Sequence, residues 1–236
     1  MTAIKNGGTI YLSGGGDKFK TFPLDKIFFG SLPKNGRLLY VPIALRERPR
    51  LYAGATKWMR GILSLHRRGD IKLEVWRNIS GKLFRDIERF DAIYIGGGNI
   101  WSLFREIKET GLDSKLIGYL RSGGIIYGGS AGAVIFGKKI SAQRDENKVG
   151  WRNDRGLDLL GGYSIFCHYR ASDRGELEGW ARQNNSNLIC LSEGSGLIMI
   201  KKKMLCVGSR PCFVFFKKAA RRRASMLRHG DSLKLK

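Results

Sequence analysis

Apolar and polar positions in the first half of the chain follow two alternating patterns. Short runs rich in β-branched and aromatic residues predict strands at 9–12 (TIYL), 37–42 (RLLYVP), 72–76 (KLEVW), 92–95 (AIYI) and 124–127 (GIIY). Stretches with helical spacing lie between them, at 52–66, 101–108 and 113–121. Alternating strands and helices favour an α/β fold with a doubly wound, mostly parallel sheet flanked by helices.

The second half of the chain is less regular. It predicts a strand at 163–166 that delivers His168, a helix at 176–183, and a strand at 187–191 that ends near Glu193. Three short apolar runs follow, at 196–200, 204–207 and 213–216, and they favour a small antiparallel meander at the C-terminal end. We expect one domain over residues 1–216 and a basic, flexible tail over 217–236.

Composition is that of an ordinary globular protein, with 42% hydrophobic residues in 236. No apolar run reaches the roughly 20 residues that span a bilayer, and the first residues show no signal-peptide pattern, so we expect a cytoplasmic protein without a membrane partner. Cys167, Cys190, Cys206 and Cys212 form no C-x-x-C pair and are predicted to be buried free thiols. Neither a zinc site nor a disulfide scaffold is expected.

The net charge of +23 is unevenly distributed. Residues 201–236 contain 12 Lys and Arg against a single acid, Asp231. A basic run such as Arg221-Arg222-Arg223 can contact nucleic acid, but no aromatic interleaving or nucleic-acid motif accompanies it. We therefore favour a solvated basic tail over a nucleic-acid-binding one.

A candidate nucleophile follows the strand at 124–127. The segment Gly128-Gly129-Ser130-Ala131-Gly132 matches G-x-S-x-G and precedes a small-residue helix start. A serine at such a turn is lifted above the sheet, and the Ala131 N–H at the helix start can stabilise an oxyanion. The alternative is a serine that only caps the helix.

A serine nucleophile needs a base, and the chain has three histidines. His229 lies in the basic tail, and His66 lies at a predicted helix end. His168 comes at the carboxyl end of a predicted strand, and open α/β sheets place their sites at such ends. His168 is therefore the leading base.

The base in turn needs an acid on its other ring nitrogen. Glu193 ends the next strand, and Asp145 and Asp173 are its rivals. The chain order of serine, histidine and glutamate differs from the serine–acid–histidine order of the α/β-hydrolases, which argues against a lipase or esterase.

A glycine-rich turn, Gly96-Gly97-Gly98-Asn99, ends a neighbouring strand. In a purely structural interpretation it is a tight turn before a helix. Its functional interpretation is a second oxyanion donor, the N–H of Gly97 or Gly98, with Asn99 beside it as a substrate-binding candidate.

Four blocks together resemble peptidase family S51, the peptidase E and cyanophycinase group. They are the strand ending in GGGN (96–99), the turn G-x-S-A-G-A (128–133), the strand ending in H-Y (168–169) and the segment L-x-E-G (191–194). The resemblance covers roughly residues 8–215. It implies a fold like that of class I glutamine amidotransferases and a triad of Ser130, His168 and Glu193. Asp145 falls where the dipeptidases of this family carry an aspartate important for activity, although Arg144 replaces the usual asparagine before it.

The chain also departs from the family pattern. The dipeptidases have a longer loop after the histidine, with an arginine that reads the aspartyl side chain of the substrate. Here the stretch is short, and Arg170 or Arg174 are the candidates to replace that arginine. Aspartyl specificity therefore remains open.

We expect a serine exopeptidase or dipeptidase that acts on small peptides and requires no metal or organic cofactor. The alternatives are a non-catalytic relative that binds a ligand or nucleic acid, and a cyanophycinase-like or isoaspartyl hydrolase. A glutamine amidotransferase normally uses a cysteine nucleophile, so Ser130 argues against that class.

Overall fold

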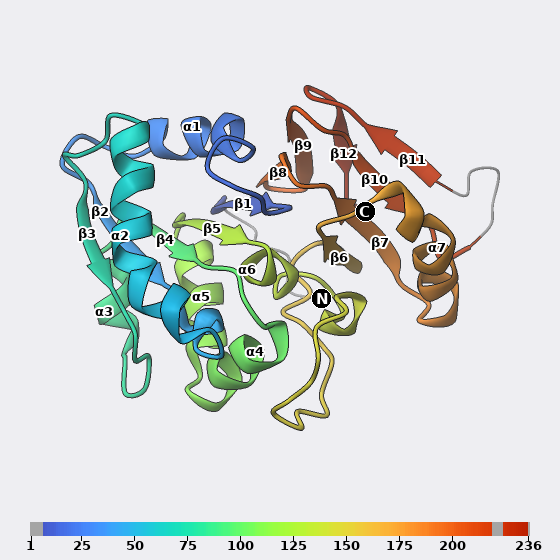
Figure 1. Ribbon diagram of the computed structural model, residues 1–236, viewed down its shortest axis with the longest axis horizontal. Coiled ribbons are helices and arrows are strands. Elements are labelled where there is room, and N and C mark those ends of the chain that lie inside the picture. Colours follow the sequence, from blue (N-terminus) through green and yellow to red (C-terminus); the bar gives the residue numbers. More distant parts are fainter. Residues whose placement is uncertain (1–6, 219–223, 236) are drawn as a thin grey trace.

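The larger of two sheets supplies the frame of the molecule. The computed structural model describes residues 7–218 and 224–235 (Figure 1). Five parallel strands form the centre and one side of this sheet: β1 (Thr9–Ser13), β2 (Arg37–Val41), β3 (Lys72–Val75), β4 (Ala92–Ile95) and β5 (Ile125–Gly129). Three antiparallel strands complete the other side: β8 (Ser195–Ile200), β9 (Lys203–Gly208) and β12 (Ser232–Lys234). Their order is β12-β9-β8-β1-β5-β4-β2-β3.

A second sheet has four strands in the order β11-β10-β7-β6. These are β6 (Tyr163–Cys167), β7 (Asn187–Leu191), β10 (Cys212–Phe215) and β11 (Ala224–Leu227). β6 and β7 run parallel, whereas β10 and β11 pair antiparallel. The parallel pair matters most for the site, because its two carboxyl ends lie side by side.

Helices cover both faces of the large sheet, as Figure 1 shows. Successive strand residues point to opposite faces, so Ile10 packs on one side and Tyr11 on the other. α1 (Phe22–Gly30) and α2 (Pro49–Leu65) cover the tyrosine face. The opposite face packs against α3 (Phe84–Glu88), α4 (Ile100–Glu109), α5 (Leu112–Arg121) and α6 (Ala131–Val134). The predicted doubly wound sheet is therefore confirmed.

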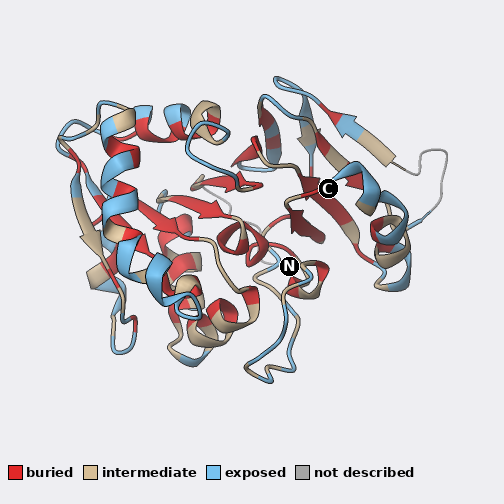
Figure 2. Cartoon of the chain, in the orientation of Figure 1, coloured by how far each residue is buried: buried red, intermediate tan, exposed pale blue. Residues whose placement is uncertain are grey.

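The central strands are buried on both faces (Figure 2). Their continuous apolar runs provide side chains to two cores at once, which is what a parallel sheet between two helical layers requires. A further helix, α7 (Arg174–Gln183), packs on the second sheet. The described residues also form three short 3-10 turns: η1 (Ile43–Leu45), η2 (Ile140–Ala142) and η3 (Ala171–Asp173). Among the described residues, no helix has the length and apolarity to cross a bilayer.

Three expectations from the sequence need correction. The sequence pattern did not predict α1 or α3. The three C-terminal runs do not form one meander, because β8 and β9 pair in the large sheet while β10 pairs with β7 in the second. The tail over 217–236 was expected to be flexible, but its described part contributes β11 and β12 to the two sheets.

Two further expectations concern the cysteines and the basic run of the tail. All four cysteines are buried free thiols, as predicted. The basic run Arg221-Arg222-Arg223 lies outside the described residues, so its role stays a prediction.

Candidate active site

Ser130 occupies a tight turn between β5 and α6, at the carboxyl end of the parallel strands. Its φ of 52° and ψ of −115° are rare for a residue other than glycine. The Ser130 N–H donates to the Ser13 carbonyl (3.0 Å), and a Cβ on Gly132 would lie 2.2 Å from the Ile95 carbonyl oxygen. Close backbone packing thus forces the conformation expected of a nucleophile at a strand-to-helix turn.

His168 reaches Ser130 from the second sheet. It follows β6, and its Nε2 lies 2.8 Å from Ser130 Oγ. The His168 N–H donates to the Gly14 carbonyl (3.2 Å), and the ring packs so closely on the turn after β1 that a Cβ on Gly15 would lie 2.5 Å from Cε1. The position of the imidazole is therefore set by both sheets.

Glu193 lies on the far side of the imidazole. It comes two residues after the end of β7, and its Oε1 is 3.1 Å from His168 Nδ1. A carboxylate at Nδ1 holds the proton on that nitrogen and leaves Nε2 free to accept the proton of the Ser130 hydroxyl. The three residues named from the sequence are thus brought together in the order serine, histidine, glutamate.

Lys20 extends the chain of contacts formed by Ser130, His168 and Glu193, and the sequence did not predict it. Its Nζ lies 2.7 Å from Glu193 Oε2. The bond from Lys20, followed by that from His168, lowers the pKa of Glu193. Lys20 lies near the end of the loop between β1 and α1, several residues past the strand end, so the strand-end rule gave no signal for it.

The two rival acids lie elsewhere. Asp145 Oδ2 accepts the Ile100 N–H (2.8 Å), and burial raises the pKa of its carboxyl group. Asp173 accepts the Arg170 N–H (2.7 Å) and pairs with Arg144 (3.1 Å). Neither occupies Nδ1 of the imidazole, although Asp145 lines the same cavity as Ser130.

The candidate oxyanion donors lie directly beside Ser130. A Cβ on Gly97 would be 3.0 Å from Ser130 Cβ, so this loop touches Ser130. Within the described part of the chain, the N–H groups of Gly97, Gly98 and Ala131 donate to no protein acceptor. These donors are therefore available to a substrate oxygen.

Asn99 is placed differently from the other candidates in the turn. Its Oδ1 accepts the N–H groups of Trp101 (2.9 Å) and Ser102 (3.0 Å), and its Nδ2 donates to the Glu146 carbonyl (2.9 Å). The side chain therefore caps α4 and fixes the glycine turn, instead of facing a substrate.

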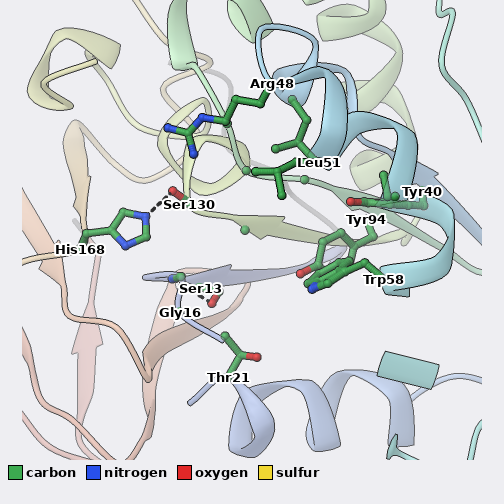
Figure 3. A pocket seen from close by; sticks show the side chains of 18 of the residues that line it. Ser13, Gly16, Thr21, Tyr40, Arg48, Leu51, Trp58, Tyr94, Ser130 and His168 are labelled. Carbon is green, nitrogen blue, oxygen red and sulfur yellow. Dashed lines mark hydrogen bonds between the residues drawn. The ribbon is translucent and has the colours of Figure 1, made fainter. Parts of the chain in front are cut away.

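A cavity of about 470 Å³ opens beside the serine, a size typical of small-molecule sites. One end contains Ser130, His168 and the glycine turn, and the other is walled by Tyr40, Trp58 and Tyr94 (Figure 3). Arg48, at the start of α2, points its guanidinium toward Ser130 and His168 (Figure 3).

The arginines predicted from the sequence do not take part in this cavity. Arg170 is exposed, and Arg174 pairs with Glu178 on α7 (2.9 Å), and neither lines the cavity of the described residues. Arg48 and Arg50 line it instead. They were missed because the approach of α2 to the strand ends is a tertiary feature.

Comparison with known proteins fits this geometry. Residues 9–207 match the model of peptidase family S51. The chain is 27% identical over 198 residues to peptidase E of Streptomyces coelicolor, covering 79% of this chain and 77% of that protein. It is 33% identical over 102 residues to an uncharacterized peptidase of Listeria monocytogenes, covering 42% of this chain and 49% of that one. The crystal structure of a peptidase from an acI-B1 Actinobacterium superposes with a TM-score of 0.73 at 17% identity and covers 97% of both chains.

The fold and these relatives define the protein as a peptidase. Because the family model spans most of the chain, the protein belongs to peptidase family S51.

Proposed function

We propose that this peptidase is a serine-type dipeptidase that acts through Ser130, His168 and Glu193. The observation that carries the proposal is the 2.8 Å contact of Ser130 Oγ with His168 Nε2, with Glu193 on the other ring nitrogen. Nucleophile, base and orienting acid in this arrangement form the constellation used for acyl transfer.

Acylation begins when Ser130 Oγ attacks the peptide carbonyl and its proton passes to His168 Nε2. The carbonyl oxygen gains the negative charge and is stabilised by the N–H groups of Ala131 and Gly97. His168 then gives its proton to the leaving amine as the C–N bond breaks. The negative Glu193 stabilises the imidazolium that exists between these two steps.

Deacylation repeats the sequence with water. His168 takes a proton from the water, the new hydroxyl oxygen attacks the ester carbonyl, and the bond to Ser130 Oγ breaks. The proton returns to Ser130, so the cycle restores the free enzyme. All the groups required are side chains and backbone donors already within the site.

Charges in the cavity favour a short substrate with free ends. The guanidinium of Arg48 has no carboxylate within 4.0 Å among the described residues, so it can bind the carboxylate of the leaving amino acid. Asp145 lines the same cavity and suits the ammonium group of an N-terminal residue. A dipeptide satisfies both groups.

Labelling with a fluorophosphonate probe tests the nucleophile. We expect one covalent adduct on Ser130, blocked in the Ser130→Ala variant and retained in Ser114→Ala, which changes an exposed serine on α5. Absence of any adduct on a folded wild-type protein would favour the non-catalytic alternative and end the proposal.

A paired substrate tests the role of Arg48. We expect Arg48→Ala to raise KM about tenfold for a dipeptide and to leave hydrolysis of the same dipeptide amide nearly unchanged, because the amide carries no carboxylate. Equal effects on both substrates would contradict binding of the free carboxylate.

A further inference from the structure

We propose that the acyl side of this site accepts a large apolar side chain, so that the preferred substrate carries an aromatic or aliphatic residue before the scissile bond. The inference rests on the proposed function, because it assigns a substrate class to the same serine site. It concerns the part of the cavity farthest from His168.

The position of the base decides which end of the cavity is the acyl end. His168 must give its proton to the leaving amine, so the leaving residue lies on the side of the imidazole. The acyl residue then extends from Ser130 in the opposite direction. Figure 3 shows that this direction leads to Tyr40, Trp58 and Tyr94.

The aromatic end begins directly at the nucleophile. A Cβ on Gly129, the residue before Ser130, would lie 3.3 Å from Tyr94 Oη. A Cβ on Gly96, in the glycine turn, would lie 3.3 Å from Tyr40 Oη. A side chain on the acyl residue therefore meets these rings within its first few atoms.

The three rings form one packed wall. Ring centroids are 5.5 Å apart for Tyr40 and Tyr94, 6.0 Å for Tyr40 and Trp58, and 6.1 Å for Trp58 and Tyr94. Tyr40 and Tyr94 are buried, so their positions in the wall are fixed by packing, whereas Trp58 is 44% exposed. The open surface of the tryptophan is therefore available for an apolar contact.

α2 presents a matching apolar stripe. Leu51, Ala55 and Trp58 are spaced four and three residues apart, so they share one face of the helix, and all three line the cavity. Leu51 is 53% exposed, so two large apolar side chains face the same space without being covered. Covering this surface with a substrate side chain removes it from water and favours binding.

Charge at this end disfavours an acidic side chain. Of the two cations that line the cavity, Arg48 directly precedes α2 and Arg50 lies in its first turn. Trp58, at the far end of the apolar stripe, lies about 12 Å from Arg50 along the helix axis at 1.5 Å per residue. Behind the wall, Tyr94 stacks on Tyr127 (4.3 Å), whose hydroxyl donates to the buried carboxylate of Asp25 (2.6 Å). A substrate carboxylate placed against Trp58 and Tyr94 would thus lose water without gaining a cation.

Steady-state kinetics on a matched set of dipeptides tests the inference. With Phe-Ala, Leu-Ala, Ala-Ala and Asp-Ala, we expect kcat/KM for Phe-Ala and Leu-Ala to exceed that for Asp-Ala by at least about tenfold. Trp58→Ala should lower kcat/KM for Phe-Ala about tenfold and leave Ala-Ala within about threefold, because alanine does not reach the indole. Trp180→Ala, which changes a half-buried tryptophan on α7 outside the cavity, is the matched control.

The outcomes separate this inference from the proposed function. A wild-type enzyme that prefers Asp-Ala, or a Trp58→Ala variant that loses Phe-Ala and Ala-Ala hydrolysis equally, would overturn the apolar acyl pocket while leaving Ser130 as nucleophile. Failure of the fluorophosphonate probe to label Ser130, with no dipeptide cleaved, would instead overturn the proposed function.

Discussion

The two sheets contribute to the site in different ways. The large sheet supplies Ser130 and the glycine turn from buried strand ends, where carbonyl oxygens and backbone atoms leave no room for other conformations. The second sheet supplies His168 and Glu193, whose side chains are 41% and 39% exposed. Ser130 is therefore held by close backbone contacts inside the protein, whereas His168 and Glu193 lie at the edge of water.

This difference shows where each half is sensitive. Steric restraint is insensitive to salt and pH but intolerant of one added carbon atom. A half-exposed ion pair tolerates substitution and responds to salt and pH, because solvent screens it. Substitutions at the contact between the halves, and within each half, should therefore differ in the size and kind of their effects.

The largest effect is expected from breaking the contact between the two halves. Ser130→Ala and His168→Ala should each lower kcat/KM by more than about a thousandfold, and the double variant should be no worse, because triad members act as a unit. Dipeptide hydrolysis by the three variants checks this. Additive losses would mean that the two side chains act independently.

The next effect concerns a charge buried within the large-sheet half. Burial raises the pKa of Asp25 from its usual 3.8 to about 6, and hydrogen bonds from Tyr127 and Thr21 only partly oppose it. The folded state thus binds this proton more tightly, so the contribution of Asp25 is most favourable below pH 3.8 and is lost as the pH rises through about 6. Asp25→Asn should remove a decrease of about 3 kcal/mol in the free energy of unfolding over that interval.

Urea unfolding of wild type and Asp25→Asn between the two pKa values measures this decrease. Asp158→Asn is a suitable control, because Asp158 is exposed and an asparagine oxygen can still accept the Gly162 N–H. A wild-type pH dependence that survives in Asp25→Asn would assign it to other groups.

A single methyl group added to the glycine turn of the large sheet should displace Ser130. Gly97→Ala places a Cβ 3.0 Å from Ser130 Cβ, and we expect about a hundredfold loss in kcat, comparable to losing one oxyanion donor. Gly61→Ala on α2 meets nothing within 4 Å and should keep full activity. Kinetics and melting temperature together distinguish this local effect from misfolding.

The smallest effect belongs to the exposed half. Lys20→Ala removes the main cause of the lowered pKa of Glu193, so the carboxylate should protonate at a higher pH than in wild type. We expect a loss of about twofold to threefold in kcat/KM, growing as the pH falls, because the pair is exposed. Carbon-13 NMR titration of Glu193 measures the pKa, and Lys18→Ala is the neighbouring control. An unchanged titration would show that Lys20 does not act on Glu193.

The sequence predicted most of the parallel half because its signals are local. Apolar runs marked the strands, and the rule that chemistry gathers at their carboxyl ends selected Ser130, His168 and Glu193 correctly as neighbours. α1 was missed because its apolar residues are not confined to one face, so it lacks a clear helical stripe.

Other features depend on contacts between distant segments. The runs at 204–207 and 213–216 look alike in sequence, yet one pairs with β8 and the other with β7. The site also receives side chains from a loop and from α2 and its N-terminal flank, namely Lys20, Arg48 and Trp58. The pattern of apolar residues in these segments does not predict where they pack in the fold. β11 and β12 were not predicted, because the many basic residues around them favoured a solvated tail.

The position of β1 has a consequence for the order of events during synthesis. Thr9 pairs with Ile125 on one side and with Ile200 on the other, so β1 is synthesised long before either of the strands that pair with it. His168 and Glu193 are also synthesised after Ser130, which they follow by dozens of residues. During synthesis the chain therefore carries Ser130 well before His168 and Glu193 are made, and the three residues can come together only when the large sheet has closed around β1.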